Sequence, residues 1–279
     1  MIYVMAHNRA DFENYRMDPE LDKELFSFFL TEGAVKDEEA SDALIKKIHA
    51  EKHQCVLEWE LPQYNHLLQR QRFFAPSILY HCHTNFIPVN PGWEYVGFLE
   101  YDLAFETDTH IAQKLGKSKS GIEDFSFCRL VKKIRAAHLG HSFIILPSIR
   151  HPLSRLDSQK DIKMKGQHWL EFFLWDYNKR YGTNYEYHQF VQDYGEHLIP
   201  TQQSFISDIR TAEQISAYTY NFIEEHGYKH QDIDQIYQPF PATIMERFIG
   251  MFIFLHTKNY ANKYTIPLVH KHSSGGIYR

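Results

Sequence analysis

Three short, continuous apolar segments constrain the fold of this chain more than any other feature. They are "IYVMA" at Ile2–Ala6, the segment "EYVGFLEYDLAF" at 94–105, whose apolar run stops at Glu100 and resumes after Asp102, and "SFIILP" at 142–147. Each is short for a helix, shows no polar–apolar alternation and is bounded by polar or turn residues. Segments of this kind are typical of strands that are buried on both faces of a parallel sheet. The sequence therefore predicts an α/β fold with a mainly parallel sheet, flanked by helices, in the first 150 residues.

The stretches between and after these segments mostly show the spacing of helices. Helices are predicted over 21–54, 65–86 with an interruption at Pro76, 122–139, 169–182, 211–227 and 242–259, and a further strand over 55–61. Thr211 is the expected N-cap of the helix that Gly227 ends. The tail after Leu268 is polar and is predicted to be flexible. We expect one domain over 1–279, with a sheet-bearing half (1–150) and a helix-rich C-terminal half (151–279).

Composition excludes several classes of protein. The net charge of −5 provides no broad basic face, so nucleic acid is not an expected partner. The longest apolar run, at 248–255, is far shorter than the ~20 residues of a transmembrane helix. The three cysteines are widely spaced, which suits a reducing compartment. We expect a cytoplasmic protein. The absence of GxGxxG, GxxxxGK[ST] and GxSxG weakens dinucleotide, P-loop and serine-hydrolase interpretations.

Two carboxylates interrupt the second apolar segment. Glu100 and Asp102 are two residues apart, so in a strand both side chains point to the same face. Two carboxylates on one face repel unless a cation or a proton lies between them. Mg²⁺ and Mn²⁺ prefer oxygen ligands and often complete their shell with substrate phosphates. The pair therefore predicts a divalent-metal site, unless it simply ends an edge strand and faces water.

Other candidates follow the first strand and open the last helix. His7, Asn8 and Arg9 come directly after the first strand and could receive the base, ribose or phosphate of a nucleotide. Glu246 and Arg247 form a charged pair in an otherwise apolar helix, where burial is costly unless the charges are paired or used. Glu246 is either a general base at an acceptor or, with Arg247, part of an internal ion pair that fixes the helix.

Histidines recur as two His-x-His groups. His81 and His83 lack partners at zinc-site spacing and are interpreted as structural. His270 and His272 precede two glycines in the tail, and such a segment could fold over a diphosphate with His272 completing the metal shell. The alternative for these two histidines is a disordered terminus.

The order of the segments resembles a known family. "EYVGFLEYDLAF", "FIILPSIR" and "FPATIMERFIGMFIFL" occur in the order of similar motifs in bacterial capsular-polysaccharide galactosyltransferases. The resemblance covers roughly residues 2–255 and implies a GT-A-like glycosyltransferase that uses a nucleotide sugar and Mn²⁺ or Mg²⁺. It also extends loosely to the glycan-building enzymes of large algal viruses, which would place the protein in a host cytoplasm.

By this resemblance Glu100-Tyr101-Asp102 is the acid-x-acid motif, Asp102 is the more direct metal ligand, and Glu246 matches the late acidic residue of the family. The chain departs from the relatives where they have "HYRR" and it has "EYDL". The implied reaction moves a sugar, xylose or galactose, from a UDP-sugar to a hydroxyl of a glycan acceptor. A non-catalytic carbohydrate- or nucleotide-binding module and a glycoside hydrolase that uses Glu100 and Asp102 remain alternatives.

Overall fold

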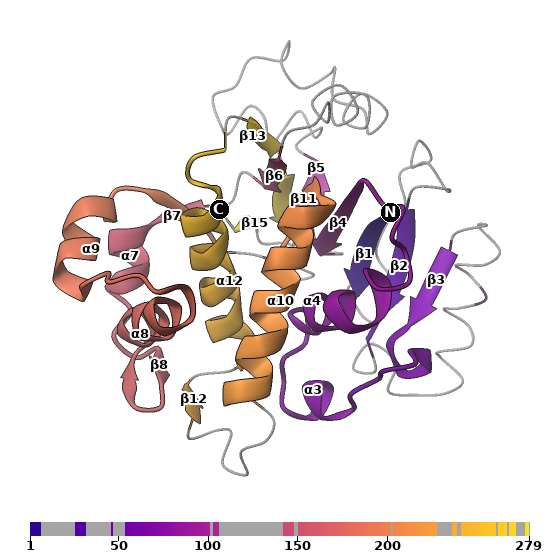
Figure 1. Ribbon diagram of the computed structural model, residues 1–279, viewed down its shortest axis with the longest axis horizontal. Helices are drawn as coiled ribbons and strands as arrows, with labels where there is room; N and C mark the ends of the chain where they lie inside the picture. Colours follow the sequence, from indigo (N-terminus) through magenta and orange to yellow (C-terminus); the bar gives the residue numbers. More distant parts are fainter. Residues whose placement is uncertain are drawn as a thin grey trace.

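A computed structural model of the chain describes residues 1–6, 26–31, 46, 54–100, 103–105, 142–147, 150–201, 203–227, 236–238, 241–260, 262–266, 268–271 and 277–278. A seven-stranded sheet forms its centre, in the order β13-β6-β11-β4-β1-β2-β3 (Figure 1). The strands are β1 (Ile2–Ala6), β2 (Phe26–Leu30), β3 (Gln54–Leu57), β4 (Tyr95–Glu100), β6 (Phe143–Pro147), β11 (Phe205–Asp208) and β13 (Asn262–Ile266).

The sheet is parallel except at one strand. β3, β2, β1 and β4 pair in parallel, as do β6 and β13. β11 lies between β4 and β6 and is antiparallel to both. All six residues of β4 and all five of β6 are buried, which explains their uninterrupted apolar sequence. The predicted α/β class and the mainly parallel sheet are confirmed.

Packing across the sheet explains one glycine of β4. A Cβ placed on Gly97 would lie 2.8 Å from Cγ1 of Ile206 in β11 and 3.2 Å from the side chain of Ile2 in β1. Only a glycine lets these two branched side chains close over β4 without a shift. The close packing of β4 against its neighbours β1 and β11 therefore requires glycine at position 97.

Helices line the sheet and extend beyond it (Figure 1). They are α3 (Leu67–Arg70), α4 (Ser77–His81), the π-helical turn η3 (Cys82–Phe86), α7 (Leu153–Asp157), α8 (Trp169–Tyr181), α9 (Tyr187–Tyr194), α10 (Ile209–His226) and α12 (Pro241–Thr257), with the 3₁₀ turn η2 (Glu58–Glu60) after β3. α10 and α12 are antiparallel, because Tyr218 stacks on Phe252 at 4.5 Å while Phe222 meets Phe248 at 4.9 Å. The helix-rich C-terminal half is confirmed.

Three small sheets complete the described part. β14 (Leu268–Lys271) lies between β15 (Ile277–Tyr278) and β5 (Leu103–Phe105). β7 (Arg150–Pro152) pairs with β10 (Leu198–Pro200), and β8 (Lys163–Met164) lies between β9 (Gln167–His168) and β12 (Tyr237–Gln238). The tail, expected to be flexible, therefore contributes two strands. No helix in the described ranges is both long and apolar enough to cross a membrane.

The helix predicted over 21–54 is wrong at residues 26–30. Phe26–Leu30 is β2, paired with β1 on one side and β3 on the other. Phe28, Phe29 and Leu30 are completely buried. A short apolar run has the same sequence pattern whether it forms a buried helix or a central strand. Here the segment is a strand because it pairs with a neighbouring strand on each side. Most of the rest of 21–54 lies outside the described residues, as does 122–139.

Two further boundaries differ from the prediction. The N-cap of α10 is Asp208, not Thr211: Asp208 Oδ1 accepts the Thr211 N–H at 3.1 Å, so the helix begins at Ile209. The strand expected over 55–61 ends at Leu57, where η2 begins. The C-terminal half also supplies β11 and β13 to the main sheet, so the sheet is built from both halves of the chain.

Candidate functional site

The strand order creates a switch point between β1 and β4. After β1 the chain continues to β2 on one side, and after β4 it continues toward β6 on the other side. In open α/β sheets, ligands bind outside the carboxyl ends of the strands at such a point. We call this end of the sheet the carboxyl edge, and it is formed in the described part by Thr31, Glu58, Glu100, Gln203 and Ser204.

Glu100 closes β4 at this edge and is held there by its neighbours. It pairs in register with Met5 near the end of β1 and is only 7 % exposed. Its Oε1 accepts a hydrogen bond from Nε2 of Gln203 at 2.6 Å, and its backbone N–H donates to Oγ of Ser204 at 3.1 Å. Gln203 and Ser204 precede the antiparallel β11, which is why they reach the same edge.

Gln203 leaves one buried oxygen unused. Its side chain is completely buried, and its Oε1 has no hydrogen-bond partner within the described residues. A buried amide oxygen without a donor is costly unless water or an ion satisfies it. Carboxylate and amide oxygens are the ligands that Mg²⁺ and Mn²⁺ prefer, so this pair of side chains fits the predicted divalent ion.

The other half of the acidic motif lies between two described strands. Tyr101 and Asp102 are outside the described residues, and the chain resumes as β5 at Leu103. β14 pairs antiparallel with β5, and His270 lies opposite Leu103. The backbone of the predicted tail histidine is therefore beside the residue that follows Asp102. His272 lies outside the described residues.

His7, Asn8 and Arg9 also lie outside the described residues. They follow Ala6, the last residue of β1, so the chain enters them from the switch point. Their predicted contacts with a nucleotide stay predictions.

Glu246 lies toward the carboxyl edge along α12. α10 begins after β11 at the amino ends of the parallel strands, so its last turn points to the carboxyl edge, and α12 runs the opposite way. Glu246, half-buried in the second turn of α12, is therefore at the end of that helix nearest the carboxyl edge.

Arg247 has a structural environment. One guanidinium nitrogen donates to the Thr243 carbonyl at 3.3 Å, and the other donates to Oε1 of Gln159. Burial lowers the pKa of Arg247. Among the residues that the structure describes, Arg247 is held by these neutral acceptors and makes no ion pair, so it ties α12 to the segment after α7.

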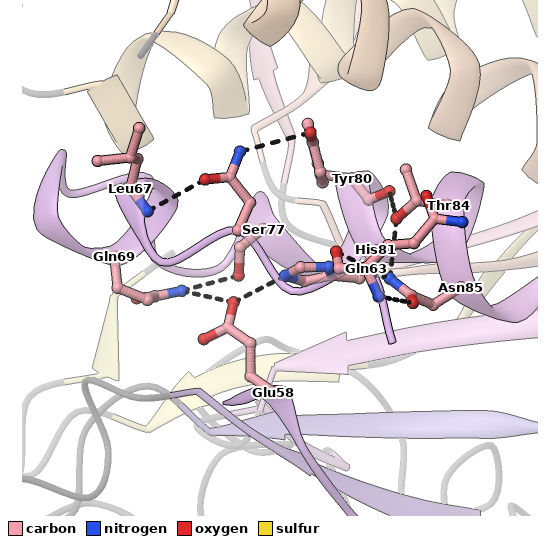
Figure 2. A network of polar contacts seen from close by, with 10 residues as sticks. Glu58, Gln63, Leu67, Gln69, Ser77, Tyr80, His81, Thr84 and Asn85 are labelled. Carbon is pink, nitrogen blue, oxygen red and sulfur yellow. Dashed lines mark hydrogen bonds and ion pairs between the residues drawn. The ribbon is translucent and has the colours of Figure 1, made fainter. Parts of the chain in front are cut away.

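Sequence reasoning missed a buried polar network at the end of β3 (Figure 2). Glu58 and His81 are both completely buried, and Glu58 Oε1 lies 3.1 Å from Nε2 of His81. The same oxygen accepts from Gln69 Nε2 at 3.0 Å, and Asn85 Nδ2 lies 3.3 Å from His81 Nδ1. The network ties the carboxyl end of β3 to α3, α4 and η3. The structural interpretation of His81 fits this geometry, and Glu58 went unnoticed because it resembles the polar position of an alternating strand.

A second missed cluster joins α8 and α10. Asp176, Glu225 and His226 place ligating atoms within 4.8 Å of one another, the one such group in the described ranges. Arg180 Nε lies 2.7 Å from Asp176 Oδ2, and Lys179 Nζ lies 2.8 Å from Glu225 Oε1. The hydrogen bond from Lys179, with help from the Arg180 charge, lowers the pKa of Glu225. Cations of the protein already neutralise both carboxylates, so the cluster is an ion-pair network and not the predicted metal site.

Comparison with known proteins gives structural neighbours only. No protein-family model matches the chain, and no curated protein matches it in sequence. Among solved structures it is similar to the apo form of the bifunctional glycosyltransferase WbbM, with 11 % identity over 96 % of this chain and a TM-score of 0.49. The chain spans 44 % of the length of that protein.

Two further structures are similar over most of the chain. Apo mouse xyloside xylosyltransferase 1 has 11 % identity over 99 % of this chain and 98 % of its own, with a TM-score of 0.41. A structure described as mannose-1-phosphate geranyltransferase from Thermus thermophilus has 10 % identity over 96 % of this chain and 74 % of its own, with a TM-score of 0.33. All three scores are below 0.5, so the class of protein rests on the sheet itself: an α/β protein with a mainly parallel sheet and a switch point between β1 and β4.

Proposed function

We propose that the chain is a GT-A-like glycosyltransferase that moves a sugar from a UDP-sugar to a hydroxyl of a glycan acceptor. The observation that carries the proposal is the buried Glu100 carboxylate beside Gln203, whose Oε1 has no partner among the described residues, at the switch point between β1 and β4. The sequence resemblance of "EYVGFLEYDLAF" and the two later motifs supports the same class. Xylose and galactose are the proposed donor sugars.

Glu100, Gln203 and Asp102 are the proposed holders of Mn²⁺ or Mg²⁺, with His272 as a further ligand. A bound divalent ion would screen the diphosphate and stabilise it as a leaving group. The residues after β1, His7 to Arg9, are proposed to contact the nucleotide, with Tyr101 and His270 beside it. The carboxyl edge is where a parallel sheet presents such groups together.

Glu246 is the proposed general base at the acceptor. It lies toward the carboxyl edge along α12, and an inverting transfer needs a group that removes the proton of the attacking hydroxyl. The pairing of β14 with β5 supports a tail that lies beside the acidic motif.

The test is release of UDP and transfer of sugar from UDP-xylose and UDP-galactose, with and without Mn²⁺. We expect metal-dependent turnover in the wild type and a loss of roughly a hundredfold or more in Asp102→Ala and Glu100→Gln. Asp193→Ala, which removes an exposed carboxylate from α9, is the matched control and should retain full activity. Full metal-dependent turnover in Asp102→Ala would overturn the metal assignment, and binding of the UDP-sugar without turnover in the wild type would favour a binding module.

A further inference from the structure

A lysine, a histidine and an aspartate form a hydrogen-bonded series at the end of α10. Lys165 Nζ lies 3.0 Å from Nδ1 of His226, and Nε2 of His226 lies 3.1 Å from Oδ1 of Asp176. Lys165 is in the turn between β8 and β9, His226 is the last residue of α10, and Asp176 is in the middle of α8. We call these three residues the Lys165 triad. The proposed glycosyl transfer uses none of them.

The partners of His226 fix the position of its proton. An ammonium has only hydrogens to donate, so Nδ1 of His226 is the acceptor toward Lys165. Nε2 therefore carries the hydrogen and donates it to Asp176. Asp176 is completely buried and His226 is 2 % exposed, so water does not compete for these contacts. Arg180 holds the second carboxylate oxygen of Asp176 at 2.7 Å and keeps it aimed at the imidazole.

The backbone holds Lys165 in place while its side chain stays exposed. Lys165 and Gly166 form the turn with φ values of 50° and 78°, a region that residues other than glycine seldom adopt. The N–H of Lys165 donates to the carbonyl of Ile236 at 2.7 Å, and its ammonium lies 5.8 Å from the centre of the Phe172 ring. An unusual backbone conformation that surrounding contacts maintain is often found at functional positions.

The Lys165 ammonium contacts an imidazole nitrogen rather than a carboxylate. Asp176 pairs with Arg180, and Glu225 pairs with Lys179 and Arg180. Within the part of the chain that the structure describes, the Lys165 ammonium makes no ion pair with a carboxylate; its polar contact is the acceptor nitrogen of His226. The amine is thus connected to a group that can take its proton.

We propose that the Lys165 triad is a nucleophile–base–orienting-acid arrangement, and that Lys165 is a site of covalent acylation by activated esters or thioesters. A nucleophile within reach of a base, itself oriented by a third group, is the arrangement that activates serine and cysteine in covalent catalysis. In the Lys165 triad an amine takes the place of the hydroxyl or thiol. The ammonium gives one proton to Nδ1 of His226, and Asp176 holds the resulting imidazolium. The neutral Nζ attacks the acyl carbon, the N–C bond forms and the bond to the leaving group breaks. The leaving alkoxide or thiolate takes the second proton from nitrogen, and an amide remains.

Competitive labelling of the intact protein tests the proposal. The folded chain is treated with substoichiometric N-hydroxysuccinimidyl acetate, and acetylation of each lysine is followed by mass spectrometry. Lys163 is the internal control, since it is exposed in the same hairpin. We expect Lys165 to react roughly tenfold faster than Lys163 in the wild type, and the two rates to become similar in His226→Gln.

A second arm needs no variant, because His226→Gln changes a buried residue and could unfold the chain. The wild type is labelled in urea above its unfolding midpoint, where the triad no longer exists. The ratio of Lys165 to Lys163 rates should fall to about one. Equal rates in the folded protein, or an unchanged ratio after unfolding, would overturn the proposal. The readout does not involve UDP-sugars, so its outcome is independent of the proposed glycosyl transfer.

Discussion

At the scale of single residues, the carboxyl edge combines burial with polarity. Thr31, Glu58, Glu100 and Gln203 are each less than 10 % exposed, although each carries a polar side chain. Buried polar groups cost free energy unless they are satisfied, so their accumulation at one end of a sheet needs a reason. Glu58 is satisfied by a protein network, whereas Thr31 Oγ1 and Gln203 Oε1 have no partner in the described ranges. Glu58 therefore belongs to a structural cluster, whereas Thr31 and Gln203 belong to a candidate ligand site.

Loss of His81 should destabilise the protein more than loss of its neighbour in the same motif. In His81→Leu, the buried Glu58 carboxylate loses its imidazole donor, and we expect the free energy of unfolding to fall by about 3 kcal/mol. His83 is half-buried and its ring lies tilted against that of Tyr220, with the ring centres 4.7 Å apart, so His83→Leu should cost below about 1 kcal/mol. Urea unfolding followed by circular dichroism measures both. Similar midpoints for the two variants would show that the Glu58–His81 contact contributes little.

At the scale of elements, α12 is placed by a contact that no local pattern reveals. A Cβ on Gly250 would lie 1.8 Å from the carbonyl oxygen of Pro200 in β10. The helix can approach β10 this closely only because the position has no side chain. The apolar pattern predicted α12 correctly, but the partner strand and the approach distance are properties of the assembled fold.

Gly250→Ala should therefore destabilise the protein although alanine is the better helix former. We expect a loss of about 3 kcal/mol, since the clash is with backbone and outweighs a gain of about 1 kcal/mol in helix propensity. Gly182→Ala is the matched control: Gly182 ends α8 at φ 64° with no atom within 4 Å of the added Cβ, so only backbone strain of about 1 kcal/mol is expected. Thermal unfolding of both variants measures how much stability each substitution removes. A Gly250→Ala protein as stable as Gly182→Ala would contradict the predicted contact.

Removal of the tail should impair donor binding and spare the main sheet. Ending the chain at Ile266 keeps β13 and deletes β14 and β15, which pair with β5 after the acidic motif. We expect an unfolding midpoint close to that of the full chain, and a loss of the thermal shift that Mn²⁺ and a UDP-sugar produce, because bound ligand stabilises by mass action. A truncated chain with an unchanged ligand-induced shift would separate the tail from the donor site.

At the scale of the whole molecule, buried cysteine and tyrosine side chains should make the folded state less stable as the pH rises into the alkaline range. Burial raises the pKa of Cys55 and Cys82 from 9.0 to about 12, with the nearby Glu60 adding to the effect at Cys55. Burial also raises the pKa of Tyr177 from 10.0 to about 12. The folded state keeps these groups protonated over a range in which the unfolded chain ionises them, so unfolding is favoured as the pH rises.

The stabilising contribution of these three groups is fully present below about pH 9 and is lost progressively toward about pH 12. We therefore expect the urea midpoint to fall between about pH 8 and about pH 11. The double variant Cys55→Ala/Cys82→Ala should show a shallower fall, because two of the three groups are gone. A midpoint that stays constant or rises over this range would contradict the prediction.

Elements whose pattern is local could be predicted from the amino-acid sequence. Continuous apolar runs predicted β1, β4 and β6, and helical spacing predicted α8, α10 and α12. Gly182 and Gly227 follow the last residues of α8 and α10, as expected. Burial on both faces of a strand, or on one face of a helix, produces a pattern that can be read directly in the sequence. Three features became visible only in the folded chain. Phe26–Leu30 is a strand, β11 runs antiparallel to both its neighbours, and Gln203, Glu58 and His226 contact residues far away in the sequence. These features arise from contacts between residues far apart in the chain, and such contacts leave no period in the sequence from which they could be inferred.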